Sequence, residues 1–205
     1  SLLCAIALLL CSIFTPTALS AISAATIGEV WDGTTATAFD GGTGEKDDPW
    51  LISNGAQLHK MANSGSATQG KYYKLTADIY LNNIASSDWK TNNPNKWSSA
   101  EQFRGHLDGD GHVIYGVYRV NTSENYTALF FSSYSDATAK NPVSIKNLGI
   151  ENSYFEGKRA AAFMGKADAS ASANFTMENC YAGEDVEVKG SIVSGGLVAV
   201  IAKTD

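Results

Sequence analysis

Cysteine is scarce in this chain, and the positions of the cysteines limit which disulfides and which thiol chemistry are possible. The 205 residues contain three cysteines, Cys4, Cys11 and Cys180. Two of them fall in an N-terminal segment that we expect to be removed on secretion, so no intramolecular disulfide framework is expected in the mature chain. Cys180 follows an apolar stretch, which indicates a packed thiol rather than a reactive nucleophile.

Charge and histidine are also sparse. Charged residues make up 18% of the sequence and the formal net charge is −6, whereas roughly a quarter of the residues in ordinary globular domains are charged. An acidic chain without basic patches does not suit nucleic acid, so no nucleic-acid partner is expected. The three histidines form no His-Glu-x-x-His motif, so the sequence contains no zinc protease site of that kind.

A long apolar run occurs at the N-terminus. Residues 2–14 have the length of a signal-peptide core, and small residues at 18–20 and 23–25 fit the pattern that signal peptidase reads. A membrane-spanning helix needs roughly 20 apolar residues, and Pro16 interrupts this run, so a membrane anchor is the weaker alternative. We expect residues 1–24 to be a signal peptide lacking its true start, and no membrane span in the mature chain.

The remainder shows no interdomain linker and is expected to form one domain over residues 26–205. Its 19 glycines and 10% aromatic residues are typical of an extracellular β protein. The sequence stops directly after the apolar stretch 197–202, and a solenoid that ended there would expose an aggregation-prone edge. We therefore expect the domain to continue beyond Asp205.

A repeated pattern is the strongest positive signal. Residues 144–164 and 175–198 each run from a short apolar strand through Glu-Asn, a small residue and a tyrosine to a glycine-containing turn. The Glu-Asn pairs at 151 and 178 lie 27 residues apart, a spacing typical of a solenoid with stacked coils. Residues 107–131 form a fainter copy. Stacked coils usually build long surfaces rather than one deep catalytic pocket.

One helix is predicted near residues 55–64. Asn54 and Gln57 form a plausible reciprocal N-capping pair, apolar residues then follow one helical face, and Gly65 is a natural stop. Alternating apolar residues over 73–81 predict a strand with one buried face. An Asn- and Ser-rich excursion, residues 82–100, follows that strand.

Four segments in a fixed order carry a resemblance to a known family. They read GGTGEKDDPWLIS, GAQLHKMA, GKYYKLTADIYL and FRGHLDGDGHVIYGV. This series resembles the N-terminal part of bacterial surface proteins with Gly-Leu-any-Gly repeats, the GLUG family, and the match covers nearly all of residues 38–201. The chain departs from the signature at Ala199, where the family has glycine, and at 160–165, where alanines replace glycines.

The resemblance implies an all-β fold, a right-handed parallel β-helix, on a secreted or wall-attached bacterial protein. In that family such regions occur in adhesin-like proteins and beside the catalytic domain of immunoglobulin-cleaving zinc metalloproteases. The expected fold is thus a β-solenoid with one short helix in its capping region.

One segment superficially resembles a calcium loop. It contains Asp108 and Asp110 within Asp-Gly-Asp-Gly-His. An EF-hand requires an acidic ligand at the twelfth loop position, which Arg119 occupies. A tight turn, with glycines at positive φ and aspartates bonded to the local backbone, is the favoured interpretation. The two aspartates remain weak metal candidates, calcium is the only cofactor considered, and none is expected.

Aromatic residues are the strongest candidates for ligand binding in this sequence. Trp89 and Trp97 lie in the polar excursion, and Tyr115 and Tyr118 follow the calcium-like turn. Flat rings flanked by Asn and Asp suit both sugar faces and protein anchors. The competing interpretation, which we favour for the tryptophans, is that they close the open end of the first coil.

Two functions remain open. The first is a non-catalytic, adhesin-like or stalk module on the bacterial cell surface that binds an extracellular glycan or protein along a lateral face. The alternative is the accessory β-helix region of a larger secreted enzyme, a zinc metalloprotease or a polysaccharide-degrading enzyme, with further domains on the same polypeptide. Because charges fall in turns without an evident column, no catalytic residues are expected in this chain.

Overall fold

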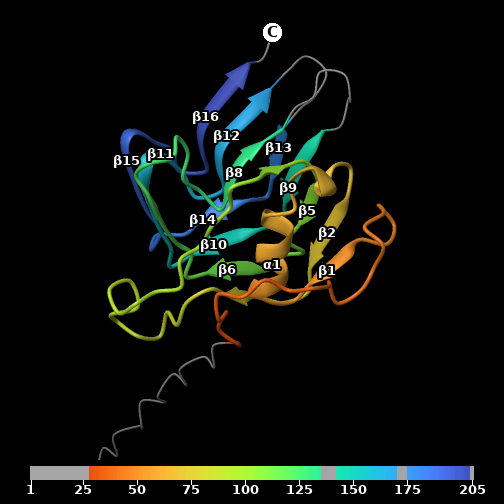
Figure 1. Ribbon diagram of the computed structural model, residues 1–205, viewed down its shortest axis with the longest axis horizontal. Coiled ribbons are helices and arrows are strands. Elements are labelled where there is room, and N and C mark those ends of the chain that lie inside the picture. The colour runs from red at the N-terminus through yellow and green to blue at the C-terminus, as the bar shows by residue number, and fades with distance from the viewer. Residues whose placement is uncertain (1–27, 135–141, 170–174, 204–205) are drawn as a thin grey trace, which may run out of the picture.

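The computed structural model describes residues 28–134, 142–169 and 175–203. The described chain winds through four successive coils whose strands stack into parallel sheets (Figure 1). This arrangement confirms the predicted parallel β-helix. The predicted signal peptide lies outside the described residues, and in the part that is described no helix is long and apolar enough to cross a membrane.

The strands form four sheets, numbered here in the order in which the chain visits them within a coil. Sheet 1 contains β1 (Trp50–Ile52), β2 (Tyr72–Leu75), β5 (His106–Asp108), β9 (Val143–Lys146) and β13 (Phe175–Glu178). Sheet 2 contains β3 (Ile79–Tyr80), β6 (Val113–Tyr115), β10 (Gly149–Glu151) and β14 (Tyr181–Ala182). Sheet 3 contains β7 (Tyr118–Asn121), β11 (Tyr154–Ala160) and β15 (Glu187–Ser194). Sheet 4 contains β4 (Gln102–Phe103), β8 (Phe130–Ser133), β12 (Met164–Ala169) and β16 (Val198–Lys203).

The register between coils corrects the repeat length read from the sequence. Glu178 pairs with Lys146, a separation of 32 residues, and not with Glu151. In the earlier coils Tyr72 pairs with His106 and His106 with Ser144, separations of 34 and 38 residues. Connections of different length between the strands make the coils unequal, so the 27-residue spacing of the Glu-Asn pairs was not the structural repeat.

An asparagine ladder lies at the corner between sheets 1 and 2. Asn147 and Asn179 follow β9 and β13 and have φ values of 53° and 51°, a left-handed conformation that asparagine tolerates. The Asn179 amide nitrogen donates to the Asn147 carbonyl oxygen at 3.1 Å. The Asn147 amide nitrogen donates in turn to Asp108 Oδ1 at 3.0 Å. Side chains at this corner therefore bond three coils together.

The core lies inside the coils. Inward-facing residues of neighbouring strands, such as Leu107 and Ile145, are aligned and almost wholly buried. Phe103 and Phe130 stack with ring centroids 4.8 Å apart. Arg119 is also buried, and its guanidinium donates to the carbonyl oxygen of Ala128 at 2.8 Å, so this charged group is compensated by hydrogen bonding.

The one α-helix among the described residues closes the first end of the solenoid. It is α1 (Gly55–Ala62), which ends earlier than predicted and is followed by the 3-10 helix η1 (Gly65–Thr68). The Asn54 side chain caps the helix by accepting from the Gln57 N–H at 3.0 Å, whereas the Gln57 side chain accepts from Ser53 rather than from Asn54. Figure 1 shows α1 in front of the coils, and its buried Leu58 belongs to the core.

Candidate functional site: a lateral groove

The outer face of sheet 1 carries two columns of outward-facing side chains. Side chains alternate between the two faces of a strand, and successive coils are aligned, so residues at equivalent positions stack along the solenoid axis. The first column is polar and the second is charged. The polar column contains Tyr72, His106, Ser144 and Thr176, and the charged column contains Lys74, Asp108, Lys146 and Glu178.

A groove runs between these columns. Its cavity measures about 410 Å³, and the floor follows the backbone of Tyr73, Leu107 and Ile145 across three coils. Lys46 and Pro49, which precede β1, line it as well. Ligand sites commonly enclose roughly 300–1,000 Å³, so the groove is large enough to hold a ligand.

The charged column corrects one expectation from the sequence. Charges do form a column on one ladder, and both of its lysines are paired with aspartates. Lys146 Nζ lies 3.0 Å from Asp108 Oδ2, and Lys74 Nζ lies 2.9 Å from Asp110 Oδ2. The assumed 27-residue repeat concealed this alignment, because it placed Glu178 above Glu151 instead of above Lys146.

The pKa values of these groups follow from the pairing. Burial raises the pKa of Asp108, but hydrogen bonds from Asn147, the Asp110 N–H and Lys146 outweigh it, so the pKa lies below its usual value. The hydrogen bond to Asp110 and the charge of that carboxylate raise the pKa of Lys74. Asp108 and Lys74 are therefore both ionised at neutral pH.

The polar column contains a stacked aromatic pair and a hydrogen bond. The rings of Tyr72 and His106 lie 4.3 Å apart with an interplanar angle of 18°. His106 Nδ1 lies 2.8 Å from Ser144 Oγ. Burial, aided by the charge of Lys46, lowers the pKa of His106, so its ring is neutral at pH 7. No carboxylate is hydrogen-bonded to this imidazole among the described residues, and the pair thus lacks the third member of a hydrolytic triad.

The calcium-like segment is a tight turn. Asp108 Oδ1 accepts from the Asp110 N–H at 3.0 Å, and positive φ values occur at Asp110 and Gly111. The carboxylates of both aspartates face lysine ammonium groups rather than each other. Over residues 28–134, 142–169 and 175–203 no group of three or more potential ligands is placed to hold a metal ion.

The two tryptophans proposed as binding residues differ in position. Trp97 is 3% exposed, and its indole N–H donates to the Leu129 carbonyl at 2.8 Å. Its burial leaves no ring face for a ligand and agrees with the structural role that the sequence analysis favoured for it. Trp89 remains in the excursion, where it is 9% exposed and lines a separate polar pocket.

The two candidate tyrosines belong to other ladders outside the groove. Tyr115 stacks on Tyr80 in sheet 2 at 4.8 Å, and burial together with the charges of Glu151 and Asp78 raises its pKa to about 12. Tyr118 stacks on Tyr154 in sheet 3 at 5.6 Å. The structure therefore does not bring the four aromatic candidates into one site. Sequence reasoning missed the groove because the alignment of its columns appears only in the true register.

Fold and groove together define a class of protein: a parallel β-helix with a lateral groove of ligand-binding size. No family model matches the chain. A protein named halomucin, from Haloquadratum walsbyi, is 32% identical over 124 residues, which cover 58% of this chain and 1% of that protein. A protein described as a Gly-rich membrane protein, from Evansella cellulosilytica, is 29% identical over 133 residues, which cover 63% of this chain and 14% of that protein.

One solved structure was also compared with the chain. It is a protein described as an immunoglobulin A1 protease from Bacteroides ovatus, 17% identical, with a TM-score of 0.36 over 80% of this chain and 65% of that chain. A TM-score this low does not establish a shared fold. The β-helix is instead identified from the pairing of its own strands. The chain spans only a small part of the curated relatives, and membership of the Gly-Leu-any-Gly family stays a prediction.

Proposed function

We propose that this chain is part of a secreted, surface-exposed bacterial β-solenoid that binds an extended neutral glycan along the outer face of sheet 1, without catalysing a reaction. The observation that carries the proposal is the groove, because it continues across coils instead of ending within one. A site built from stacked coils repeats along the solenoid axis, so it suits a ligand that is itself long and repetitive.

A carbohydrate fits this face better than a peptide does. The peptide groups of sheet 1 are already paired between coils, so the face offers no free backbone ladder to an extended peptide. Recognition must therefore come from side chains. Sugar hydroxyls both donate and accept, and they match the hydroxyl of Ser144, the imidazole of His106 and the charged groups of the second column.

The charge balance favours a neutral glycan. Lys46, Lys74 and Lys146 line the groove together with Asp108 and Glu178. Asp110, outside the lining, pairs with Lys74, and Asp108 pairs with Lys146. A uronate polymer presents a carboxylate at each repeat and would meet two acidic residues of the column. An uncharged chain avoids that repulsion and still finds charged donors and acceptors, which form the stronger hydrogen bonds.

Two features support a location outside the cell. The N-terminal apolar segment has the pattern of a signal peptide, and one relative is described as a membrane protein. The residues that resemble the Gly-Leu-any-Gly family agree with a bacterial surface protein. Together with a lateral binding face, these features favour an adhesin-like or stalk role.

The test is a binding screen with the whole chain against immobilised neutral and acidic oligosaccharides, followed by titration of the best ligand. Tyr72→Ala and Ser144→Ala are expected to weaken binding about 3- to 10-fold each, corresponding to about 0.7–1.4 kcal/mol. Tyr181→Ala is the matched control, since this exposed tyrosine lies on sheet 2. It should leave affinity unchanged.

Two results would contradict the proposal. Retained affinity in both groove variants would place the ligand elsewhere. Release of new reducing ends from a bound polymer, lost in His106→Gln, would show that the groove is catalytic and would favour the polysaccharide-degrading alternative.

A further inference from the structure

The excursion between β3 and β4 forms a second, smaller cavity, distinct from the groove. The segment packs against sheet 3. The backbone N–H of Trp97 donates to the Tyr118 carbonyl at 2.8 Å. The Trp89 ring packs edge-on against the Tyr118 ring, and Lys90 forms an ion pair with Glu187. Contacts with β7 and β15 thus fix the excursion to two different coils.

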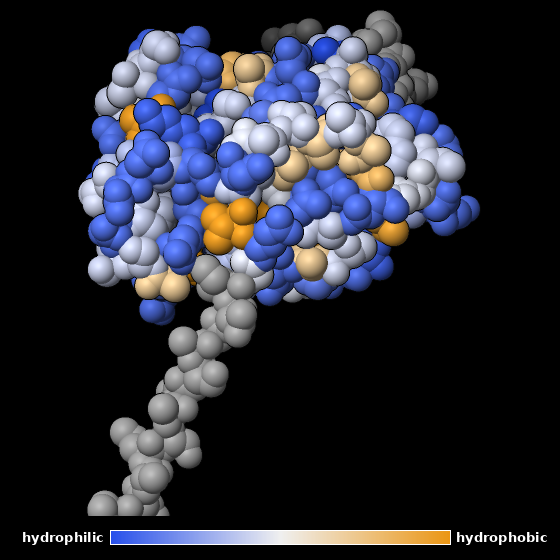
Figure 2. Space-filling model, turned by 60° about the horizontal axis from the view of Figure 1, so that its bottom comes forward, coloured by the Kyte–Doolittle hydropathy of each residue, from blue (hydrophilic) through white to orange (hydrophobic). Residues whose placement is uncertain are grey.

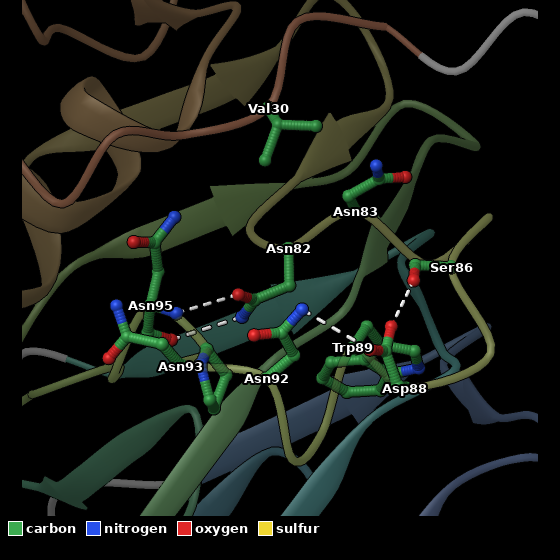
Figure 3. A pocket seen from close by; sticks show the side chains of 10 residues that line it. Val30, Asn82, Asn83, Ser86, Asp88, Trp89, Asn92, Asn93 and Asn95 are labelled. Atoms are coloured by element: carbon green, nitrogen blue, oxygen red, sulfur yellow. Dashed lines mark hydrogen bonds between the residues drawn. The ribbon is translucent and has the colours of Figure 1, made fainter.

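Two asparagines form a rigid frame at one side of this cavity. The Asn82 amide nitrogen donates to the carbonyl oxygens of Gly116 at 2.8 Å and of Asn95 at 3.0 Å. The Asn95 N–H donates back to Asn82 Oδ1 at 2.7 Å, and the Asn95 amide reaches the backbone of Leu81 and of Trp31. Figure 3 shows this reciprocal pair. The frame is therefore built before any ligand arrives.

The cavity measures about 290 Å³, and Trp89 and several asparagines line it. At its other side Asp88 accepts hydrogen bonds from Ser86 and, at 3.2 Å, from the Asn92 amide (Figure 3). The hydrogen bond from Ser86 lowers the pKa of Asp88. This carboxylate is the one ionised group in the lining. The ammonium of Lys90 lies 5.6 Å from the Trp89 ring and is paired with Glu187.

Other polar groups in the lining are available to a ligand. Asn83 and Asn93 are exposed, and no hydrogen bond to a protein acceptor is found for either side-chain amide nitrogen among the described residues. Asn93 has a φ of 51°, a left-handed conformation that asparagine tolerates. The indole N–H of Trp89 likewise has no acceptor in the described part of the chain.

We propose that this pocket binds a single neutral sugar unit. Amide groups donate and accept, as sugar hydroxyls require, and the small exposed part of the Trp89 indole adds one apolar contact to the pocket. The volume lies at the lower limit for ligand pockets, which fits one monosaccharide better than a longer chain. Lys90 is paired with Glu187 and lies outside the lining, so Asp88 is the charged group that a ligand meets. Its carboxylate repels an acidic sugar, and its oxygens already accept hydrogen bonds from Ser86 and Asn92, which leaves a neutral sugar as the favoured ligand.

The surface around this end of the molecule agrees with a polar ligand. Figure 2 shows hydrophobic residues in small groups separated by hydrophilic ones, without one broad apolar surface. A broad apolar surface would have favoured a protein partner. This pocket is independent of the groove, because its lining residues belong to the excursion and to Val30, not to sheet 1.

The experiment uses the full chain labelled with 5-fluorotryptophan, whose four tryptophans give separate fluorine resonances. The Trp89 signal is assigned with Trp89→Phe, and glucose, galactose, mannose, xylose, glucuronate and glucosamine are titrated in turn. At least one neutral sugar should shift that signal with a millimolar dissociation constant. Asn93→Gly and Asn83→Ala should each weaken that binding 3-fold or more.

The variants separate binding from folding. Glycine accepts the φ of position 93 without strain, so Asn93→Gly removes the amide without disturbing the loop. Asn125→Ala, at an exposed asparagine in another loop, should leave affinity unchanged, and Tyr72→Ala should do so too if the two sites are separate. The proposal is overturned if no neutral sugar shifts the Trp89 signal, if both pocket variants bind normally, or if a charged sugar binds more tightly than its neutral counterpart.

Discussion

Replacing Asn147 tests how the coils are held in register at the corner of sheets 1 and 2. Its side chain makes two hydrogen bonds, to Asp108 below and to Asn179 above, and its backbone has a φ of 53°. Alanine loses both bonds, each worth about 0.5–1.5 kcal/mol. It must also adopt a left-handed conformation, which costs about 1–2 kcal/mol. Since one bond is exposed, we expect Asn147→Ala to lower the free energy of unfolding by about 2–3 kcal/mol.

Glycine at the same position separates the two contributions. Asn147→Gly loses the same hydrogen bonds but adopts the φ value without strain, so it should be destabilised by about 1–2 kcal/mol. At most positions a glycine variant is less stable than the alanine variant. Here we predict the reverse, with Asn147→Gly more stable than Asn147→Ala. Urea unfolding monitored by circular dichroism measures both variants against Asn125→Ala. The reasoning is refuted if Asn147→Ala is as stable as that control, or if the glycine variant is the less stable of the two.

Three further predictions concern the core, pH and the last coil. Trp97→Ala should destabilise the fold by about 3–5 kcal/mol, as loss of a buried aromatic does, and a normal unfolding midpoint would contradict its burial. Burial lowers the pKa values of His59 and His106, so the unfolded chain takes up protons first and stability should fall as pH drops below about 6.5. If the His59→Gln, His106→Gln double variant loses the same amount of stability at low pH, groups other than these two histidines are responsible. In a protein made of these 205 residues, the amides of β15 and β16, which within the described ranges pair on one side only, should exchange hydrogen faster than those of β11 and β12, and equal protection would contradict this.

The sequence predicted the elements better than their alignment. The helix was identified from the capping side chain of Asn54, and β2 from strict alternation, because both signals are local. Coil register depends on the lengths of irregular connections such as residues 82–100, which carry no period. A shift in register changes which residues stack, and the wrong spacing concealed the column formed by Asp108, Lys146 and Glu178.

The sequence was also limited in predicting which of the candidate binding residues lie at a pocket. Polar neighbours made both tryptophans of the excursion candidate binding residues, although a structural role was favoured for them. The backbone hydrogen bond from Trp97 to Tyr118 accompanies the burial of the Trp97 ring in the core. Trp89, eight positions earlier in the same polar segment, lines a cavity instead. Composition identified the loop, and only tertiary contacts show that Trp97 is wholly structural while Trp89, though mostly buried, borders a pocket.

The most direct test of glycan binding along sheet 1 is calorimetric titration of the chain with a neutral oligosaccharide series of increasing length. The groove extends over the strands from β2 to β13, a distance of about 14 Å at the usual strand spacing. Affinity should rise with each added sugar until this length is filled, then level off, and the rise should be smaller in Ser144→Ala. An affinity that does not depend on length, or that is the same in the variant, would contradict a binding site that follows the solenoid axis.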